Sequence, residues 1–266
     1  MTIMGALELA ETYHRTGDWD YDCGTALLRS LAIGPGMRVL EFGSATGRLA
    51  IDAAHLVVPD GQVIGLEPSE GRVQLARRFY RAGNVTFQQG GPAELEALGD
   101  SAVDLVYSNL LLHRIDDPAQ ALGAVFRSLK PGGPLAFTFP LSHPPLVEAL
   151  EEAIFSHSTF ATHRDGASGL ATWSRRSLED WLDLARGAGF AGVSAQRIVA
   201  QMAFDTPSSL VAYWESATEG RFLGGLSATE REAASPLVDE QFFRVWGEKP
   251  LRSQVEVVAI HAARPD

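Results

Sequence analysis

Residues 39–48, which read VLEFGSATGR, form a loop that could hold a nucleotide-like ligand. An apolar run containing the acid Glu41 ends here, and Gly43 and Gly47 follow close together. Glycines are typical of places where the backbone turns sharply and a ligand comes close to it. The segment therefore predicts a binding loop after the first strand of an α/β sheet.

A second acid, Glu67, ends the next apolar run, at 61–67, about 20 residues after the glycine loop. A carboxylate at this place accepts hydrogen bonds from both ribose hydroxyls and excludes a ribose phosphate. Ser44 and Thr46 add hydroxyl groups to the loop, although ordinary turn chemistry is the simpler interpretation of Thr46. Together these residues predict a nucleoside site.

The loop departs from the dinucleotide pattern G-x-G-x-x-G, in which a helix N-terminus holds a pyrophosphate. The three corresponding positions are Gly43, Ala45 and Arg48, and Arg48 would crowd close packing of helix on strand. A nucleoside without phosphate tolerates a looser loop. If φ of Ala45 is positive, alanine costs on the order of 1 kcal/mol; if φ is negative, the cost is one methyl group near the ligand.

Two histidines could act as a general base if the substrate carries a hydroxyl group. His113 follows the apolar run at 102–109, and His143 follows the run at 134–140. The alternatives are that His113 packs beneath a lid helix and that His143 is an ordinary loop residue beside prolines. No Cys/His cluster has the spacing of a zinc site, so no metal is expected.

The elements that must position these residues alternate from about residue 37 to residue 140. Strands are expected at 37–42, 61–67, 85–89, 102–109 and 134–140, and helices at 47–57, 69–83, 93–98 and 118–130. Ser69 and Asp117 are typical N-caps, and Gly83 with Asn84 is expected to end the second helix. Strict alternation of strand and helix implies a parallel sheet with helices on both faces.

The pattern changes after residue 141. A capping box of Ser177 and Asp180 opens a helix at 177–190. Two long strands are expected at 191–204 and 253–263, with a helical insertion at 205–252 between them. Within the insertion, helix starts are expected at Thr206-Pro207 and at Ser227 with Glu230.

Composition limits the class of protein. The 266 residues, 45% of them hydrophobic, suit one large domain, or one domain with a sizeable insertion. A net charge of -11 argues against nucleic acid as a partner. Apolar runs are too short for a membrane span, the N-terminus does not resemble a secretion signal, and Cys23 is a single cysteine. A cytoplasmic protein is the expectation.

Four segments in order, at 39–50, 63–78, 85–95 and 104–140, resemble the successive motifs of class I S-adenosylmethionine (SAM)-dependent methyltransferases. The similarity is greatest to the small-molecule group that includes ubiquinone/menaquinone and malonyl-carrier-protein methyltransferases. It covers residues 25–141 well, and the later helix and last strand more loosely. The resemblance implies a Rossmann-like, doubly wound sheet of seven strands in the order 3-2-1-4-5-7-6, with the last strand antiparallel. SAM would lie across the carboxyl ends of strands 1, 2 and 4.

The resemblance also implies a set of cofactor-binding residues. In this set Glu41 favours the cationic amino group of SAM. Tyr21, like His14, lies in the N-terminal segment that in family members closes over the methionine end of SAM. The set is Glu41, Gly43, Ser44, Ala45, Gly47, Glu67, Pro68, Gly91, Pro92, Ser108, Asn109 and Tyr21. Family members often have an acid after strand 3 that accepts the adenine amino group. Gly91 stands there in this sequence, so Gln89, a backbone carbonyl or Glu94 could substitute.

The segments that flank the core at 31–141 contain all five tryptophans, at positions 19, 173, 181, 214 and 246. We expect 1–30 to form a helical lid and 142–176 and 205–252 to form lid insertions on the acceptor side. An apolar roof of this kind favours a flat or apolar acceptor and excludes water. The alternatives are that the aromatic residues only pack the helices on the sheet, support its edge, or form an oligomer interface.

The sequence therefore predicts an enzyme, a SAM-dependent methyltransferase that acts on a small apolar or aromatic molecule by O- or C-methylation and releases S-adenosylhomocysteine (SAH). One alternative is a protein of the same fold that uses SAM structurally or for a reaction such as cyclisation, which the unusual Ala45 and Gly91 motivate. Another is a non-catalytic regulatory subunit. The oligomeric state is left open.

Overall fold

The computed structural model describes residues 4–158, 160–161, 176–223, 226–247 and 250–266. The chain divides into two compact units, each assembled from separate segments. We call Asp20–Leu141, Ser174–Ile198 and Val257–Asp266 the sheet unit, and Met1–Trp19, Ser142–Trp173 and Val199–Glu256 the helical unit. Trp173 lies outside the described residues.

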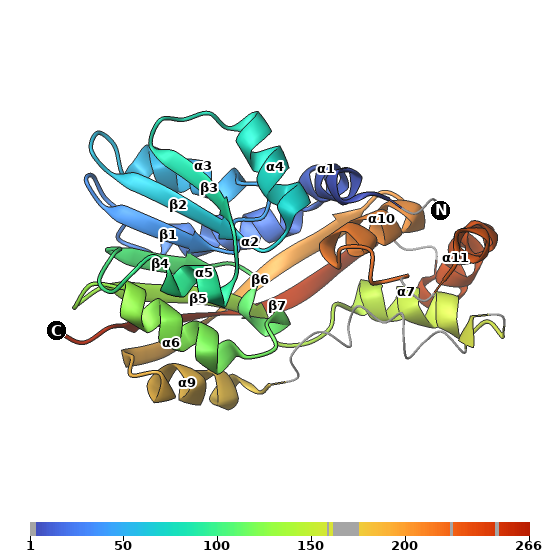
Figure 1. Ribbon diagram of the computed structural model, residues 1–266. Coiled ribbons are helices and arrows are strands. Elements are labelled where there is room, and N and C mark those ends of the chain that lie inside the picture. Colours follow the sequence, from blue (N-terminus) through green and yellow to red (C-terminus); the bar gives the residue numbers. More distant parts are fainter. Residues whose placement is uncertain (1–3, 159, 162–175, 224–225, 248–249) are drawn as a thin grey trace. The chain divides into compact units, whose positions relative to one another are not determined.

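One sheet of seven strands, in the order β3-β2-β1-β4-β5-β7-β6, organises the described chain (Figure 1). The strands are β1 (Arg38–Phe42), β2 (Gln62–Glu67), β3 (Val85–Gln89), β4 (Leu105–Ser108), β5 (Pro134–Pro140), β6 (Ala191–Phe204) and β7 (Leu251–Ala263). β1 pairs in parallel with both β2 and β4, whereas β7 is antiparallel to β5. The predicted fold class and strand order are confirmed.

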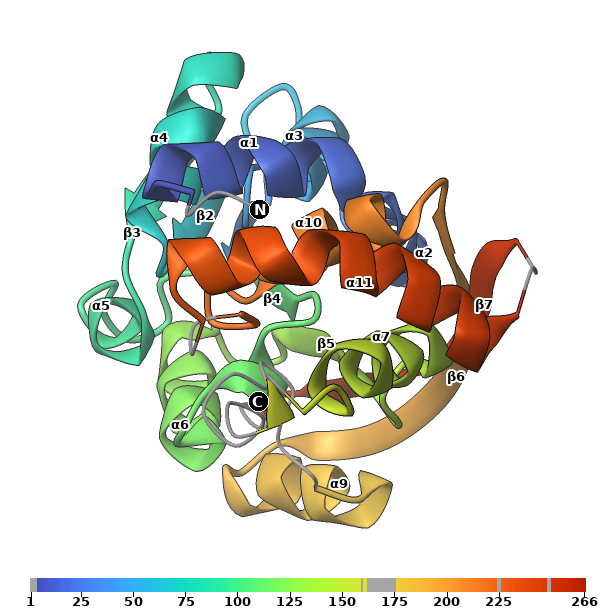
Figure 2. The same cartoon turned by 90° about the vertical axis from the view of Figure 1, so that its right-hand side faces the viewer.

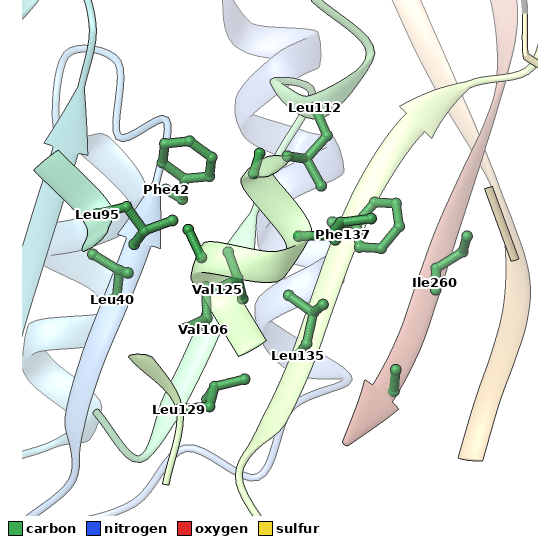
Figure 3. Close-up of a cluster of buried hydrophobic side chains, with 14 of the residues drawn as sticks. Leu40, Phe42, Leu95, Val106, Leu112, Val125, Leu129, Leu135, Phe137 and Ile260 are labelled. Carbon is green, nitrogen blue, oxygen red and sulfur yellow. The ribbon is translucent and has the colours of Figure 1, made fainter. Parts of the chain in front are cut away.

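Two apolar layers hold helices against the two faces of this sheet. Leu40 and Phe42 of β1 contribute to one layer, while Val39 contributes to the other, because successive side chains of a strand point to opposite faces. Figure 3 shows the first layer, where Val125 of α6 packs among residues of β1, β4, β5 and β7. Trp181 joins this layer, with its ring 5.1 Å from that of Phe139, so this tryptophan packs helix α9 on the sheet.

The helices associated with the sheet begin close to their predicted caps. They are α2 (Asp18–Arg29), α3 (Arg48–Leu56), α4 (Glu70–Phe79), α5 (Pro92–Glu96), η1 (Leu112–Arg114), α6 (Pro118–Ser128) and α9 (Leu178–Gly187). Asp117 and Ser177 cap α6 and α9 through their side chains. The expected end of α4 near Gly83 is wrong: the helix stops at Phe79, because Tyr80 turns into an extended conformation and packs its ring 6.3 Å from that of Phe87.

The helical unit contains α1 (Ala6–Thr16), α7 (Pro145–Phe155), α10 (Pro207–Ala217) and α11 (Ala228–Trp246) (Figure 2). Within it α10 packs against α1 and α11, and α11 packs along α7. Capping boxes at Thr206 and Ser227 open α10 and α11 as predicted. Tyr213, Trp214 and Phe242 are fully buried and form the core of this unit.

Among the described residues, the chain passes between the two units after β5, within β6 and within β7. β5 ends at Pro140, and the helical unit takes over at Ser142. The chain returns through β7, where Val257 pairs with Pro140. At the N-terminus the boundary falls after Trp19, so α1 belongs to the helical unit and nearly all of α2 to the sheet unit; the predicted lid at 1–30 is thus divided. None of the described helices has the length and apolarity needed to cross a membrane.

Candidate functional site

The glycine loop joins β1 to α3 in a left-handed conformation. φ is 92° at Gly43, 45° at Ala45 and 87° at Gly47. Ala45 therefore carries the conformational cost of about 1 kcal/mol that a positive φ imposes on a residue with a Cβ atom. Its N–H donates to Oε2 of Glu67 at 2.9 Å, which holds the strained turn in place.

Gly43 and Gly47 are also required by the protein's own packing. A Cβ atom on Gly43 would lie 2.7 Å from Cδ2 of Leu111, and one on Gly47 would lie 2.7 Å from Cζ of Phe87. The sequence interpretation explained both glycines by the approach of a ligand. Contacts with two neighbouring side chains are sufficient to explain them, so these glycines shape the loop whatever it binds.

Glu67 connects the glycine loop to the turn after β2. Its side chain is buried and accepts hydrogen bonds from the N–H groups of Ala45 and Ser69, at 2.9 and 3.0 Å. Arg72 lies 3.8 Å from Oε1. A carboxylate has about four acceptor positions. Glu67 therefore orders the loop, and its role in ribose recognition stays a prediction.

Three buried side-chain oxygens lie near the carboxyl ends of the neighbouring strands β1 and β4 or in the loop after β1. They are Oε2 of Glu41, Oγ of Ser44 and Oγ of Ser108, and none has a hydrogen-bond partner among the described residues. Leaving a buried polar group unsatisfied costs about 1–3 kcal/mol. Several such groups at adjacent strand ends indicate a site whose hydrogen bonds a polar ligand completes.

Asn109 fixes the end of β4. Its Oδ1 accepts a hydrogen bond from the Thr138 hydroxyl at 2.8 Å, and its Nδ2 donates to the carbonyl oxygen of Asp20 at 2.8 Å. Thr138 also accepts from the N–H of Leu110, whose φ is 52°. Asn109 thus links β4, β5 and α2 and positions Ser108. The sequence analysis missed Thr138, although a single hydroxyl within the apolar strand β5 was a usable signal.

Tyr21 is held against the start of α3. Its hydroxyl donates to Oδ2 of Asp52 at 2.7 Å, and the guanidinium carbon of Arg48 lies 4.0 Å from the centre of its ring. The hydrogen bond to Asp52 is the main reason that the pKa of Tyr21 is raised, and burial adds to it. The expectation that Arg48 crowds the packing of helix on strand is wrong, because its side chain lies over Tyr21.

The residues proposed for adenine recognition make local contacts. Gln89 is exposed and donates to the carbonyl oxygen of Pro68 at 3.3 Å. Glu94 accepts the N–H of Gly91 at 2.7 Å, and this hydrogen bond lowers the pKa of its carboxyl. Glu94 therefore acts as the cap of α5, which begins at Pro92.

The two candidate bases belong to different units. His113 lies in η1 of the sheet unit, is 2% exposed, and has Nε2 at 3.4 Å from Nε of Arg114. Burial, and then the charge of Arg114, hold the pKa of His113 well below 6.5, so the ring is neutral. His143 is half-buried and precedes α7 in the helical unit, which also contains the half-buried His14 on α1.

Comparison with known proteins identifies the family to which this chain belongs. Residues 33–176 match a protein family described as a methyltransferase domain. The chain belongs to this methyltransferase family. The matched residues include the glycine loop, Glu67 and the carboxyl ends of β1, β2 and β4. The family predicted from the sequence is thereby confirmed.

Individual relatives agree with this assignment. Demethylmenaquinone methyltransferase of Lactococcus lactis is 30% identical over 175 residues, which cover 61% of this chain and 69% of that protein. Mouse arsenite methyltransferase is 32% identical over 129 residues, 44% of this chain, and the match spans only about a third (34%) of that relative's length. The solved structure of the YcgJ protein from Bacillus subtilis superposes with a TM-score of 0.61 at 17% identity, covering 92% of this chain and 99% of that one, and so shares the fold.

Proposed function

We propose that this protein is an enzyme that transfers a methyl group from SAM to a small acceptor and releases SAH. The observation that carries the proposal is the left-handed glycine loop beside three buried oxygens without described partners, in a methyltransferase-family sheet. Glu67 suits the ribose hydroxyls, Glu41 the ammonium group, and Ser44 and Ser108 the remaining polar edge of the cofactor. SAM, when bound, supplies an electrophilic methyl group on a sulfonium.

The test is ligand binding followed by turnover. SAH should bind in isothermal titration calorimetry and raise the melting temperature by linkage, whereas NADH, the matched dinucleotide control, should do neither. Failure of SAH to bind at millimolar concentration would contradict the proposal and favour a regulatory subunit. Binding of SAH without transfer of labelled methyl from SAM to any small molecule of a cell extract would favour structural use of SAM or a reaction such as cyclisation.

We propose further that the helical unit provides the acceptor side of the site. In the chain, the helical unit begins at Ser142, directly after Pro140, which ends β5 at the carboxyl edge of the sheet and pairs with Val257. Methyl transfer needs the acceptor at that edge, held in a dry environment about 3 Å from the methyl group.

The aromatic cluster of the helical unit supports a flat, apolar acceptor that is methylated on oxygen or carbon. Tyr213 contacts Tyr13, Trp19, Phe204 and Trp214, with ring centres 5.4–6.3 Å apart. Tyr213 and Trp214 are fully buried, so they serve packing, while Tyr13 and Phe204 are partly exposed. Aromatic walls with a few polar groups are typical of sites for such molecules.

Kinetics with a reduced naphthoquinone as the acceptor can show which aromatic residues of the cluster contact the acceptor and which only pack the helical unit. Tyr13→Leu and Phe204→Leu should raise the KM for this acceptor several-fold and leave SAH affinity unchanged. Phe79→Leu is the matched control, because Phe79 is an exposed phenylalanine of the sheet unit. If the two variants only melt earlier and keep the KM of the parent, the helical unit is a structural element.

For a hydroxyl acceptor we propose that a histidine takes the proton. The low pKa of His113 makes it a weak base, so His143→Ala should cost more activity, roughly 10²–10⁴ in kcat. SAH binding should stay intact in both alanine variants. If both keep near-full activity between about pH 6 and pH 9, positioning alone carries the reaction.

A further inference from the structure

Tyr107 and Glu41 lie side by side on the face of the sheet covered by α2 and α3. They are direct partners in the register of β1 and β4, the two strands that lie next to each other in Figure 1. Neighbouring strands are about 4.8 Å apart, and residues opposite each other point to the same face. Tyr107 packs with Val39 and Leu105, which marks this face as the one toward α2 and α3.

Both side chains are wholly buried, at 0% exposure for Tyr107 and 1% for Glu41. The Tyr107 hydroxyl and Oε2 of Glu41 each lack a partner with hydrogen-bond geometry in the part of the chain that the structure describes. They are nevertheless close enough for each to shift the pKa of the other. A small movement of either side chain would therefore bring the hydroxyl to the carboxyl group.

Among the described residues, the charged groups that shift the pKa of Glu41 are acids. Glu67 of β2 and Asp52 of α3, which is bound to Tyr21 of α2, both raise its pKa. Burial is the largest cause and brings the pKa to about 8, while the Tyr107 hydroxyl acts in the opposite direction. Near neutral pH the ligand-free protein thus keeps a proton on Glu41.

We propose that Tyr107 is the positioning residue for the amino-acid end of the cofactor: its hydroxyl donates to Glu41 when the ligand's ammonium group enters, and that entry expels the proton of Glu41 into solvent. The inference rests on the proposed function. The balance is simple, because a neutral carboxylic acid and an ammonium ion become a carboxylate–ammonium pair and one released proton. A buried carboxylate needs both a cation and hydrogen-bond donors, and Tyr107 provides the donor from the adjacent strand.

The experiment is calorimetry with SAH, repeated near pH 7 in phosphate and in Tris, whose different ionisation enthalpies reveal how many protons are released. The parent should release close to one proton near pH 7 and almost none near pH 9. 5′-Methylthioadenosine, which has the nucleoside and the thioether but no ammonium group, should bind without release. Glu41→Gln should abolish release with SAH.

Tyr107→Phe keeps the buried ring and removes the hydroxyl. It should weaken SAH binding at least about tenfold, the effect expected for a hydrogen bond to a charged group, and leave 5′-methylthioadenosine affinity unchanged. Binding of SAH to the parent with no proton release would overturn the inference, and so would an equal loss of affinity for both ligands in Tyr107→Phe. If neither ligand binds the parent, the proposed function itself fails, and the inference with it.

Discussion

Two buried glutamates, one in each unit, differ in what the protein provides for them. Glu215 of α10 is 3% exposed and has Arg231 of α11 as ion-pair partner. Its Oε2 also accepts the N–H of Leu223 at 2.8 Å. Glu41 of β1 is 1% exposed, yet Oε2 has no partner among described residues, and the nearby charges that act on it are acids.

This difference separates a structural carboxylate from one prepared for a ligand. In the helical unit, Arg231 also donates from Nε to the carbonyl oxygen of Leu226 at 3.1 Å, so the pair joins α10, the following turn and α11. The protein itself thus provides the cation and a hydrogen-bond donor for the carboxylate of Glu215. In the sheet unit, Glu41 is desolvated and none of the described charges that shift its pKa is a cation, which favours a cationic ligand as its partner.

The largest expected effect comes from breaking the completed pair. Arg231→Met would leave the carboxylate of Glu215 buried without its cation, which costs about 3–5 kcal/mol. Chemical denaturation should detect this loss, and Glu215→Leu combined with Arg231→Met should recover much of it. Arg244→Met, which removes an exposed pair with Glu240 on the same helix, should cost less than about 0.5 kcal/mol. An equal loss in the free energy of unfolding for Arg231→Met and Arg244→Met would show that the buried pair of Glu215 and Arg231 is not a special structural feature of the helical unit.

A smaller effect is expected from Glu67, which has both a structural and a binding role. Glu67→Ala removes the acceptor of two backbone N–H groups and the predicted ribose contact. SAH affinity should fall by about 1.5–3 kcal/mol, the range for hydrogen bonds to a charged group. Calorimetry measures the affinity, and unchanged affinity would exclude Glu67 from ribose recognition.

The state of Glu41 predicts a pH dependence of stability. The pKa is raised from 4.5 to about 8 in the folded protein, so between these values the folded state binds the proton more tightly than the unfolded chain. The free energy of unfolding should therefore decrease as pH rises from about 4.5 to about 8. Glu41→Gln should lessen this decrease in melting curves recorded across the range. An identical pH profile for parent and variant would mean that Glu41 is already ionised in the folded protein.

The smallest effect is expected at Ala45. Ala45→Gly relieves the strain at φ of 45°, worth on the order of 1 kcal/mol, but adds entropy to the unfolded chain. Stability should thus change by less than about 1 kcal/mol, and SAH affinity should stay within about tenfold of the parent. A much larger gain in affinity would show that Ala45 has impaired the loop, which would favour structural use of the cofactor.

Apolar runs and caps predicted most element positions, because they are local signals, whereas the order of the strands was predicted from the family resemblance. β3, β5 and β6 begin and end where their sequence patterns predict. The end of α4 was not predictable from Gly83, because the contact of Tyr80 with Phe87 of another strand decides it.

Glu41 and Glu67 were named from the sequence, and both side chains are buried at the carboxyl ends of β1 and β2, while their roles toward a ligand stay predictions. Roles that depend on which elements lie side by side could not be read from spacing. Tyr107 lies opposite Glu41 in the register of β1 and β4, and Asp52 of α3 accepts a hydrogen bond from Tyr21 of α2. In the helical unit, Trp214 belongs to the insertion predicted as an acceptor roof, and its side chain is fully buried, which the sequence pattern did not show. Single-sequence patterns show that an aromatic residue is apolar but do not show which neighbours surround it.

The division of both units into separate chain segments has a consequence for how the protein can fold and be re-engineered. α1, near the N-terminus, packs against α10, and β7, near the C-terminus, pairs with β5 in the middle of the sequence. Neither unit can therefore be completed during synthesis before most of the chain has emerged. To replace the helical unit with that of a relative, all of its chain segments would have to be replaced together. Replacing only 205–252 would separate α10 from the surface of α1 on which it packs.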